Sequence, residues 1–141
     1  MVPIPTTLLE QLQRDEGFRP TPYRDSQGYW TIGYGWCLER RPMSLRIATL
    51  ILEEQMQENA VEVINHLPWS KGLDEVRRAV LTNVTFNVGL GGLLKFEKML
   101  AAMEANDWAT AAKELLDSKY AGQVGLRAER LAEQIRSGVF Q

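Results

Sequence analysis

The stretch from Glu16 to Trp36, EGFRPTPYRDSQGYWTIGYGW, determines the expected fold. Its first residue is an acid that directly precedes Gly17, and glycine at this position is typical of the end of a helix. The residues that follow are rich in Tyr, Trp, Thr and Ile and are interrupted by Gly, Pro, Asp and Ser. This pattern predicts a β-hairpin whose turn, DSQG, begins at Asp25.

Three polar side chains of this stretch, Glu16, Asp25 and Thr31, are candidates for catalysis. Two carboxylates and a hydroxyl suit the hydrolysis of a glycosidic bond: one carboxyl protonates the leaving oxygen, while the other carboxylate and the hydroxyl hold a water. The negative end of a helix dipole disfavours an ionised carboxylate, which suits Glu16 to proton donation. The alternatives are structural. Asp25 is also a typical turn opener, and threonine is common in strands.

The rest of the chain is predicted to be helical. Thr7 and Glu10 have the spacing of a capping box that opens a first helix. Its buried side would be Leu8, Leu9 and Leu12. A long amphipathic helix is expected over residues 44–67, with its apolar stripe running from Leu45 through Leu52 and Met56. Further helices are expected at residues 74–88, 93–105, 107–117 and 126–137.

These elements predict one α+β domain over residues 1–141. A β-hairpin lobe over residues 17–43 and a helical lobe over residues 1–16 and 68–141 would be joined by the helix at 44–67, with a cleft between the lobes. The length and the apolar fraction of 45% are ordinary for a single globular domain.

Composition excludes several classes of function. A formal net charge of −2 argues against non-specific binding to nucleic acid, although cations gather locally, for example at Arg40 and Arg41. One His and one Cys cannot form a metal site, and we expect no cofactor. Neither a transmembrane run nor a signal peptide is recognisable, so we expect synthesis in a cytoplasm. The single Cys37 suits that compartment.

The chain resembles the phage-type lysozymes, which are muramidase endolysins of tailed bacteriophages (glycoside hydrolase family 24). The resemblance lies in EGFRPTPYRD and TIGYG, in FNVG at residues 86–89, and in NDWATAAKELLDSKY and GLRAERLAEQIRSGVF near the C-terminus. Eight residues separate Glu16 from Asp25, and five separate Asp25 from Thr31. The resemblance implies a lysozyme-like fold in which Glu16 is the general acid, Asp25 the base or charge stabiliser, and Thr31 the holder of the water.

The resemblance also implies the reaction. The expected substrate is the β-1,4 bond between N-acetylmuramic acid and N-acetylglucosamine in peptidoglycan, cut with inversion by carboxyl groups about 6.5–9.5 Å apart. We expect a monomer that is made in the host bacterial cytoplasm and does not insert stably into membranes. A separate holin would let it act in the periplasm or on the cell wall.

Further residues are predicted to support catalysis or bind substrate. Arg127 matches the family arginine that pairs with the catalytic Glu, although an exposed helix arginine is the alternative. Asn87 and Phe86 match residues that face the cleft, with Phe86 almost as well explained as a core residue. Tyr29 and Cys37 complete this set. For Tyr29, we expect packing within the small lobe more than stacking on a sugar.

One departure from the family and two rival functions remain open. Many members carry His after TIGYG, where this chain has Trp36, and the acid that pairs with that His is replaced by Gln55. Lytic transglycosylase action is one rival; it can proceed without an essential second carboxylate, so Asp25 and Thr31 argue against it. The other rival is an inactive wall-binding module of the same fold, against which the intact Glu, Asp and Thr set argues.

Overall fold

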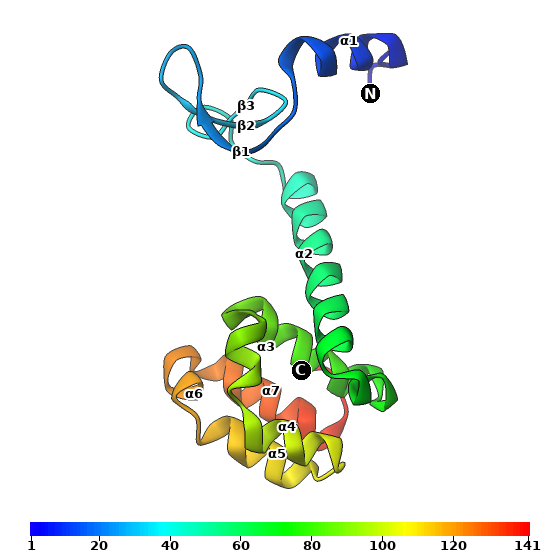
Figure 1. Ribbon diagram of the computed structural model, residues 1–141, viewed down its shortest axis with the longest axis vertical. Helices are drawn as coiled ribbons and strands as arrows, with labels where there is room; N and C mark the ends of the chain where they lie inside the picture. The colour runs from blue at the N-terminus through cyan, green and yellow to red at the C-terminus, as the bar shows by residue number, and fades with distance from the viewer. The chain divides into compact units, whose positions relative to one another are not determined.

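The computed structural model describes residues 1–141 and divides into two compact units, Met1–Ala48 and Thr49–Gln141. The elements of the first unit are α1 (Thr6–Glu16), β1 (Arg19–Arg24), β2 (Trp30–Gly33) and β3 (Trp36–Cys37) (Figure 1). The long helix α2 (Leu45–His66) begins in this unit and continues into the second. The second unit adds the 3-10 turn η1 (Pro68–Gly72), α3 (Glu75–Leu94), α4 (Glu97–Glu104), α5 (Trp108–Leu116), α6 (Lys119–Val124) and α7 (Leu126–Ser137). Seven helices and one small sheet confirm the α+β class.

The sheet is antiparallel, with strand order β1-β2-β3. Across β1 and β2, Arg24 lies opposite Trp30 and Tyr23 opposite Thr31, and the register is irregular between Arg19 and Tyr23. The prolines within β1 explain this, because proline cannot donate a ladder hydrogen bond and is confined to edge strands or bulges. The predicted hairpin is therefore confirmed. The third strand was not predicted, since two residues are too few to show a period.

Helix α1 ends as predicted and begins differently. It ends at Glu16, and Gly17 follows with a positive φ of 71°. Its N-cap is Pro5, and no side chain caps it, so the predicted capping box at Thr7 is wrong: Thr7 already lies inside the helix. No residue of α1 is buried. The predicted buried side is also wrong, because Leu8, Leu9 and Leu12 are 39%, 52% and 49% exposed.

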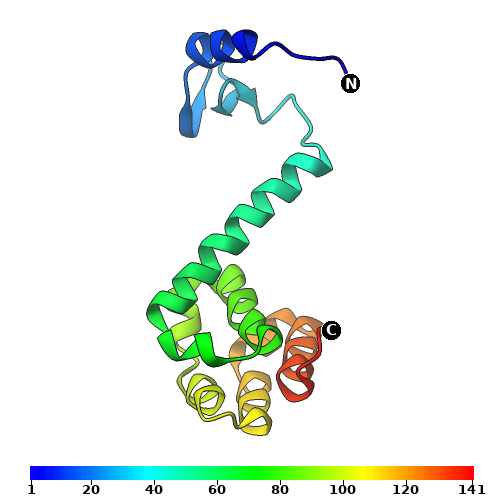
Figure 2. The same cartoon turned by 90° about the vertical axis from the view of Figure 1, so that its right-hand side faces the viewer.

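The hydrophobic core lies in the second unit. In Figures 1 and 2, α7 lies beside α3 and α5, and α5 lies beside α4. The largest fully buried apolar side chains are Leu81, Leu93, Met99, Met103, Leu115, Ile135, Val63, Val80 and Val84. Val63 is the only buried residue of α2, and Leu45, Leu52 and Met56 are exposed. The predicted apolar stripe, which continues through Ala60 and Val63 to Leu67, is therefore buried only toward its C-terminal end, where Val63 is fully buried and Leu67 packs against the core.

The helix boundaries follow local signals. Asp107 caps α5 and Gly138 ends α7 in the left-handed conformation, as predicted. The glycines after Val88 do not separate two helices, however, because α3 continues to Leu94 through a kink at Gly89, where φ is 76° and ψ is 168°. No single helix is long and apolar enough to cross a membrane; α3 and α4 meet that length and composition only when taken together, and they are bent by 101°.

Candidate active site

The Glu16 carboxyl group lies directly against the backbone of Gly35, in the turn between β2 and β3. A Cβ atom added to Gly35 would stand 2.8 Å from Oε2 of Glu16 and 3.3 Å from its Cδ. A Cβ contact of 2.8 Å is too short, so any other residue here would require the Glu16 carboxyl group to shift. Gly35 also has a φ of +70°, which glycine adopts without strain. The approaching group is the candidate acid, and its contact with Gly35 brings the end of α1 against the sheet.

Asp25 opens the turn between β1 and β2. Its Oδ1 accepts hydrogen bonds from the backbone N–H groups of Gln27 and Tyr29, both at 2.9 Å. The N–H of Gly28 donates to the backbone carbonyl of Asp25 at 3.0 Å and closes the turn. Asp25 therefore has the structural role of a turn opener, and its Oδ1 atom fulfils that role. Both side-chain bonds use Oδ1, so Oδ2 of this half-buried carboxylate is left to accept a hydrogen bond from water.

Thr31 lies in the central strand β2 and is only 3% exposed. Its hydroxyl donates to the backbone carbonyl of Tyr29 at 3.0 Å. The same carbonyl accepts the backbone N–H of Asp25 at 2.9 Å, so the main chain of Tyr29 connects two of the candidate catalytic residues. Because the hydroxyl proton of Thr31 is already donated, its oxygen is available as an acceptor.

The two other candidates in the sheet lie beside these residues. Cys37 is directly opposite Thr31 in the register of β2 and β3, and its half-buried thiol is free. The half-buried ring of Tyr29 lies under the guanidinium of Arg40, 4.6 Å from the ring centroid. Trp36, which stands where many family members have His, pairs with Ile32 across the strands. The roles of Tyr29 and Cys37 toward substrate stay predictions.

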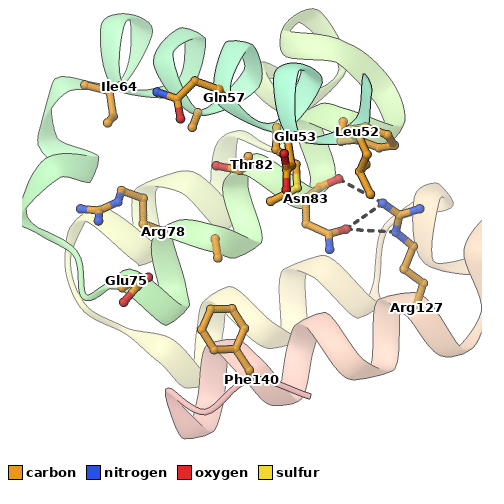
Figure 3. Close-up of a pocket in the computed structure, with 14 residues that line it drawn as sticks. Leu52, Glu53, Gln57, Ile64, Glu75, Arg78, Thr82, Asn83, Arg127 and Phe140 are labelled. Carbon is orange, nitrogen blue, oxygen red and sulfur yellow. Dashed lines mark hydrogen bonds between the residues drawn. The ribbon is translucent and has the colours of Figure 1, made fainter. Parts of the chain in front are cut away.

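The remaining candidates belong to the second unit. Arg127 donates through Nε and one terminal nitrogen to Oδ1 of Asn83, at 3.0 and 2.8 Å, and also to the backbone carbonyl of Asn83 at 3.2 Å (Figure 3). Both residues line a pocket of about 710 Å³ that Phe86 also lines. Phe86 is 41% exposed, so its interpretation as a core residue is wrong. Asn87 is exposed, and the roles of Arg127 toward Glu16 and of Asn87 toward substrate stay predictions.

Sequence reasoning missed Asn83, the residue that holds Arg127. A signal was present, because Asn83 precedes Phe86 by three residues and Asn87 by four, which places all three on one helix face. Nearby, burial raises the pKa of the Tyr120 phenol, an effect that the charge of Arg127 partly offsets. No group of three or more His, Cys, Asp or Glu side chains comes together in the chain.

The small sheet thus carries the Asp25 carboxylate and the Thr31 hydroxyl, and the Glu16 carboxyl group approaches it from the end of α1. The phage lysozyme family model matches residues 13–133, and the chain belongs to this family. Membership implies hydrolysis of peptidoglycan and confirms the resemblance on which the interpretation of the sequence rested.

Three relatives illustrate the range of the family. The chain is 29% identical to the pre-baseplate central spike protein Gp5 of Enterobacteria phage T4 over 94% of its own length, but it spans only 28% of that protein. It is 27% identical to probable T4-type lysozyme 1 of Dictyostelium discoideum, with 96% of each chain covered. Identity to probable T4-type lysozyme 2 of the same organism is 24%, over 96% of this chain and 97% of the relative.

Proposed function

We propose that the protein is a muramidase that hydrolyses the β-1,4 bond between N-acetylmuramic acid and N-acetylglucosamine in peptidoglycan. The observation that carries this proposal is that Glu16, from the end of α1, and Asp25, from the β1–β2 turn, both lie at the small sheet that contains Thr31. The Glu16 carboxyl group lies against Gly35 of the β2–β3 turn, and Asp25 and Thr31 are joined through the main chain of Tyr29.

In the proposed mechanism Glu16 is the general acid and gives its proton to the glycosidic oxygen. Asp25 Oδ2 and the Thr31 hydroxyl oxygen both act as acceptors, so a water between them donates both of its hydrogens. Its lone pair is then directed at the anomeric carbon, and Asp25 takes the proton as the bond forms. A water held on the face opposite the leaving group gives inversion at that carbon.

Hydrolysis is favoured over transglycosylation by the connection between Asp25 and Thr31. In a transglycosylase the substrate's own hydroxyl attacks, and a second positioned carboxylate is unnecessary. Here Asp25 is fixed by two backbone N–H groups, and the Thr31 hydroxyl is fixed by a carbonyl bonded to the same Asp25 residue. This preorganisation suits the binding of a water.

The proposal is tested by digesting purified peptidoglycan and identifying the products by mass spectrometry. Reducing N-acetylmuramic acid ends are expected. Ends in the 1,6-anhydro form would instead support transglycosylation, and a complete lack of cleavage would support the inactive wall-binding module. Glu16→Gln is expected to abolish cleavage with an unchanged circular dichroism spectrum, because the amide has no proton of comparable acidity. An active Gln variant would contradict the assignment of the acid.

We further propose a lytic role for a monomeric chain that reaches the wall from the host cytoplasm only after a separate holin has opened the membrane. Expression of the chain alone in a Gram-negative host should leave the cells intact until chloroform permeabilises their membrane. Spontaneous lysis without permeabilisation would contradict this role.

A further inference from the structure

Four arginines of the sheet segment, residues 17–43, lie over aromatic rings. Arg19 is 4.2 Å from the centroid of Tyr23 and Arg24 is 4.3 Å from that of Trp30. The other two pairs join Arg40 to Tyr29 at 4.6 Å and Arg41 to Trp36 at 5.1 Å. Such pairs occur roughly once per 70–80 residues in proteins, so four within this short segment are an unusual concentration.

These cations are not neutralised within the segment. Its only acids are Asp25 and Glu39, so four arginines leave it at +2, whereas the whole chain carries −2. Both acids bind backbone N–H groups, since Asp25 accepts from Gln27 and Tyr29 and Glu39 accepts from Trp30 at 3.1 Å. None of the ion pairs of the chain includes an arginine of this segment.

Two of the four arginines are placed beside the candidate catalytic residues. The ring under Arg40 belongs to Tyr29, whose main chain links Asp25 to Thr31. The ring under Arg19 belongs to Tyr23, which lies opposite Thr31 in the register of the sheet. Residues directly opposite in antiparallel strands share one face of the sheet. Arg19 and Arg40 are thus close to the residues that would hold the scissile bond.

The other two arginines, Arg24 and Arg41, are less suitable for binding a ligand beside Thr31 and Asp25. Arg24 donates to the backbone carbonyl of Gly28 at 2.8 Å and so stabilises the turn. Arg41 lies over Trp36, which precedes Cys37 and therefore points to the face opposite Thr31. Only Arg19 and Arg40 combine a position beside Thr31 or Asp25 with a guanidinium that makes no hydrogen bond within the chain.

A guanidinium held over a ring by a cation–π contact still has all its N–H groups available, and it can bind a carboxylate through two parallel hydrogen bonds. Stacking also orders the long side chain in advance, which lowers the entropy lost on binding. The glycan strand of peptidoglycan is uncharged, and the free carboxylates of the polymer belong to the stem peptides carried by muramic acid. We propose that Arg19 and Arg40 bind stem-peptide carboxylates beside the scissile bond, an inference that rests on the proposed muramidase function.

Binding is the direct test, and it is measured in the Glu16→Gln background so that no substrate is consumed. Pelleting assays compare intact Gram-negative sacculi with glycan strands stripped of peptides by an amidase. Adding Arg19→Gln and Arg40→Gln together should raise the Kd for sacculi about fivefold, as expected for two exposed charge pairs. The increase should shrink at high salt, because exposed charges are screened. For stripped strands the two proteins should differ by less than twofold.

Arg14→Gln is the matched control, because Arg14 is an exposed arginine of the same unit that bonds to Asp15 at 3.1 Å. This change should leave both Kd values unaltered. An equal weakening on both substrates, or none on either, would overturn the proposal. The double Lys variant, Arg19→Lys with Arg40→Lys, retains both charges and should bind sacculi more tightly than the double Gln variant. Equal binding by the two variants would show that the lost charges are not what weakens binding. Hydrolysis of peptidoglycan by the protein without substitutions is measured separately. A failure of the proposed muramidase function is therefore distinguished from a failure of the proposed carboxylate binding by Arg19 and Arg40.

Discussion

Gly35 is the residue whose replacement tests most sharply how Glu16 is placed. In Gly35→Ala the new Cβ would collide with the Glu16 carboxyl group, 2.8 Å from Oε2, and displace it. We expect kcat to fall at least tenfold, because a misplaced acid loses its geometry for proton transfer. The measurement is steady-state hydrolysis of purified peptidoglycan.

Gly33→Ala is the matched control for Gly35→Ala. Gly33 has nearly the same φ, +67°, so alanine costs a similar backbone strain of about 1–2 kcal/mol at both positions. A Cβ at Gly33 would meet nothing within 4 Å. The two variants should therefore lose similar stability, while Gly35→Ala loses far more activity. Equal activities would show that the contact with Glu16 is irrelevant to catalysis.

Asp25 combines a structural and a catalytic role, which two substitutions separate. Asn retains an oxygen that can accept the N–H groups of Gln27 and Tyr29, so Asp25→Asn should fold normally but lose the charge that activates water. We expect at least a hundredfold loss of kcat, in the range typical of a general base. Asp25→Ala should in addition lose about 1–2 kcal/mol of unfolding free energy, measured by urea denaturation. Near-full activity of the Asn variant would reduce Asp25 to a turn residue.

At this scale the candidate catalytic residues could be predicted, but their connections could not. The spacing of Glu16, Asp25 and Thr31 and the chemistry of their side chains can both be seen in the amino-acid sequence. The link through Tyr29 is made by its main-chain groups, which every residue has, so no sequence signal distinguishes it. The contact between Glu16 and Gly35 could not be predicted, since a glycine in a turn does not indicate which side chain approaches it.

Among the elements, α3 and α7 are joined by side-chain hydrogen bonds, of which those of Arg77 lie at the end of α7. Arg77 of α3 donates through Nε to the carbonyl of Ile135 at 2.7 Å and through a terminal nitrogen to that of Arg136 at 3.1 Å. Its guanidinium also lies over Trp108, 4.1 Å from the ring centroid, and bonds Asp74 at 3.2 Å. Arg77 thus satisfies carbonyls at the C-terminal end of α7, where a cation is favourable.

Replacing Arg77 by Met retains most of the apolar stem and removes the guanidinium. We expect a loss of about 2–3 kcal/mol in unfolding free energy, because two carbonyls of α7 lose charged donors. Arg130→Met, at an exposed position of α7, should cost less than about 0.5 kcal/mol. Urea denaturation of both variants provides the measurement, and equal losses would contradict the role assigned to Arg77.

Elements were predictable where their signals are local. The cap at Asp107 and the glycine stops at Gly17 and Gly138 depend on neighbouring residues only. Helix α6 was missed because its six residues are too short to show a period, and the kink at Gly89 was read as a helix end. The predicted burial of the apolar face of α1 was wrong for a different reason. An amphipathic pattern indicates which face of a helix is apolar, but it does not show that another element covers that face.

Over the whole molecule, burial is distributed unequally. In the first unit Thr31 is the only buried residue, whereas the second unit has a continuous hydrophobic core. Amides of the sheet should therefore exchange hydrogen at least tenfold faster than those of α3 and α7, because opening a segment with few buried contacts costs less free energy. Hydrogen exchange followed by mass spectrometry checks this. Protection of β2 equal to that of α7 would contradict it.

At the scale of the whole chain, the fold class and the family could be predicted from motifs spread along the sequence, which the family match over residues 13–133 confirms. The division into the units Met1–Ala48 and Thr49–Gln141 could not be placed. The division falls inside α2, where the helical pattern is uninterrupted, so no local sequence signal marks it.

The most direct test of the central claim is digestion of peptidoglycan in isotopically labelled water, followed by mass spectrometry of the released muropeptides. If Glu16 protonates the leaving oxygen while Asp25 and Thr31 hold the attacking water, each new reducing muramic acid end should carry one labelled oxygen. The Glu16→Gln protein should release no such product. Unlabelled 1,6-anhydro ends, or labelled ends released by the Gln variant, would contradict the account.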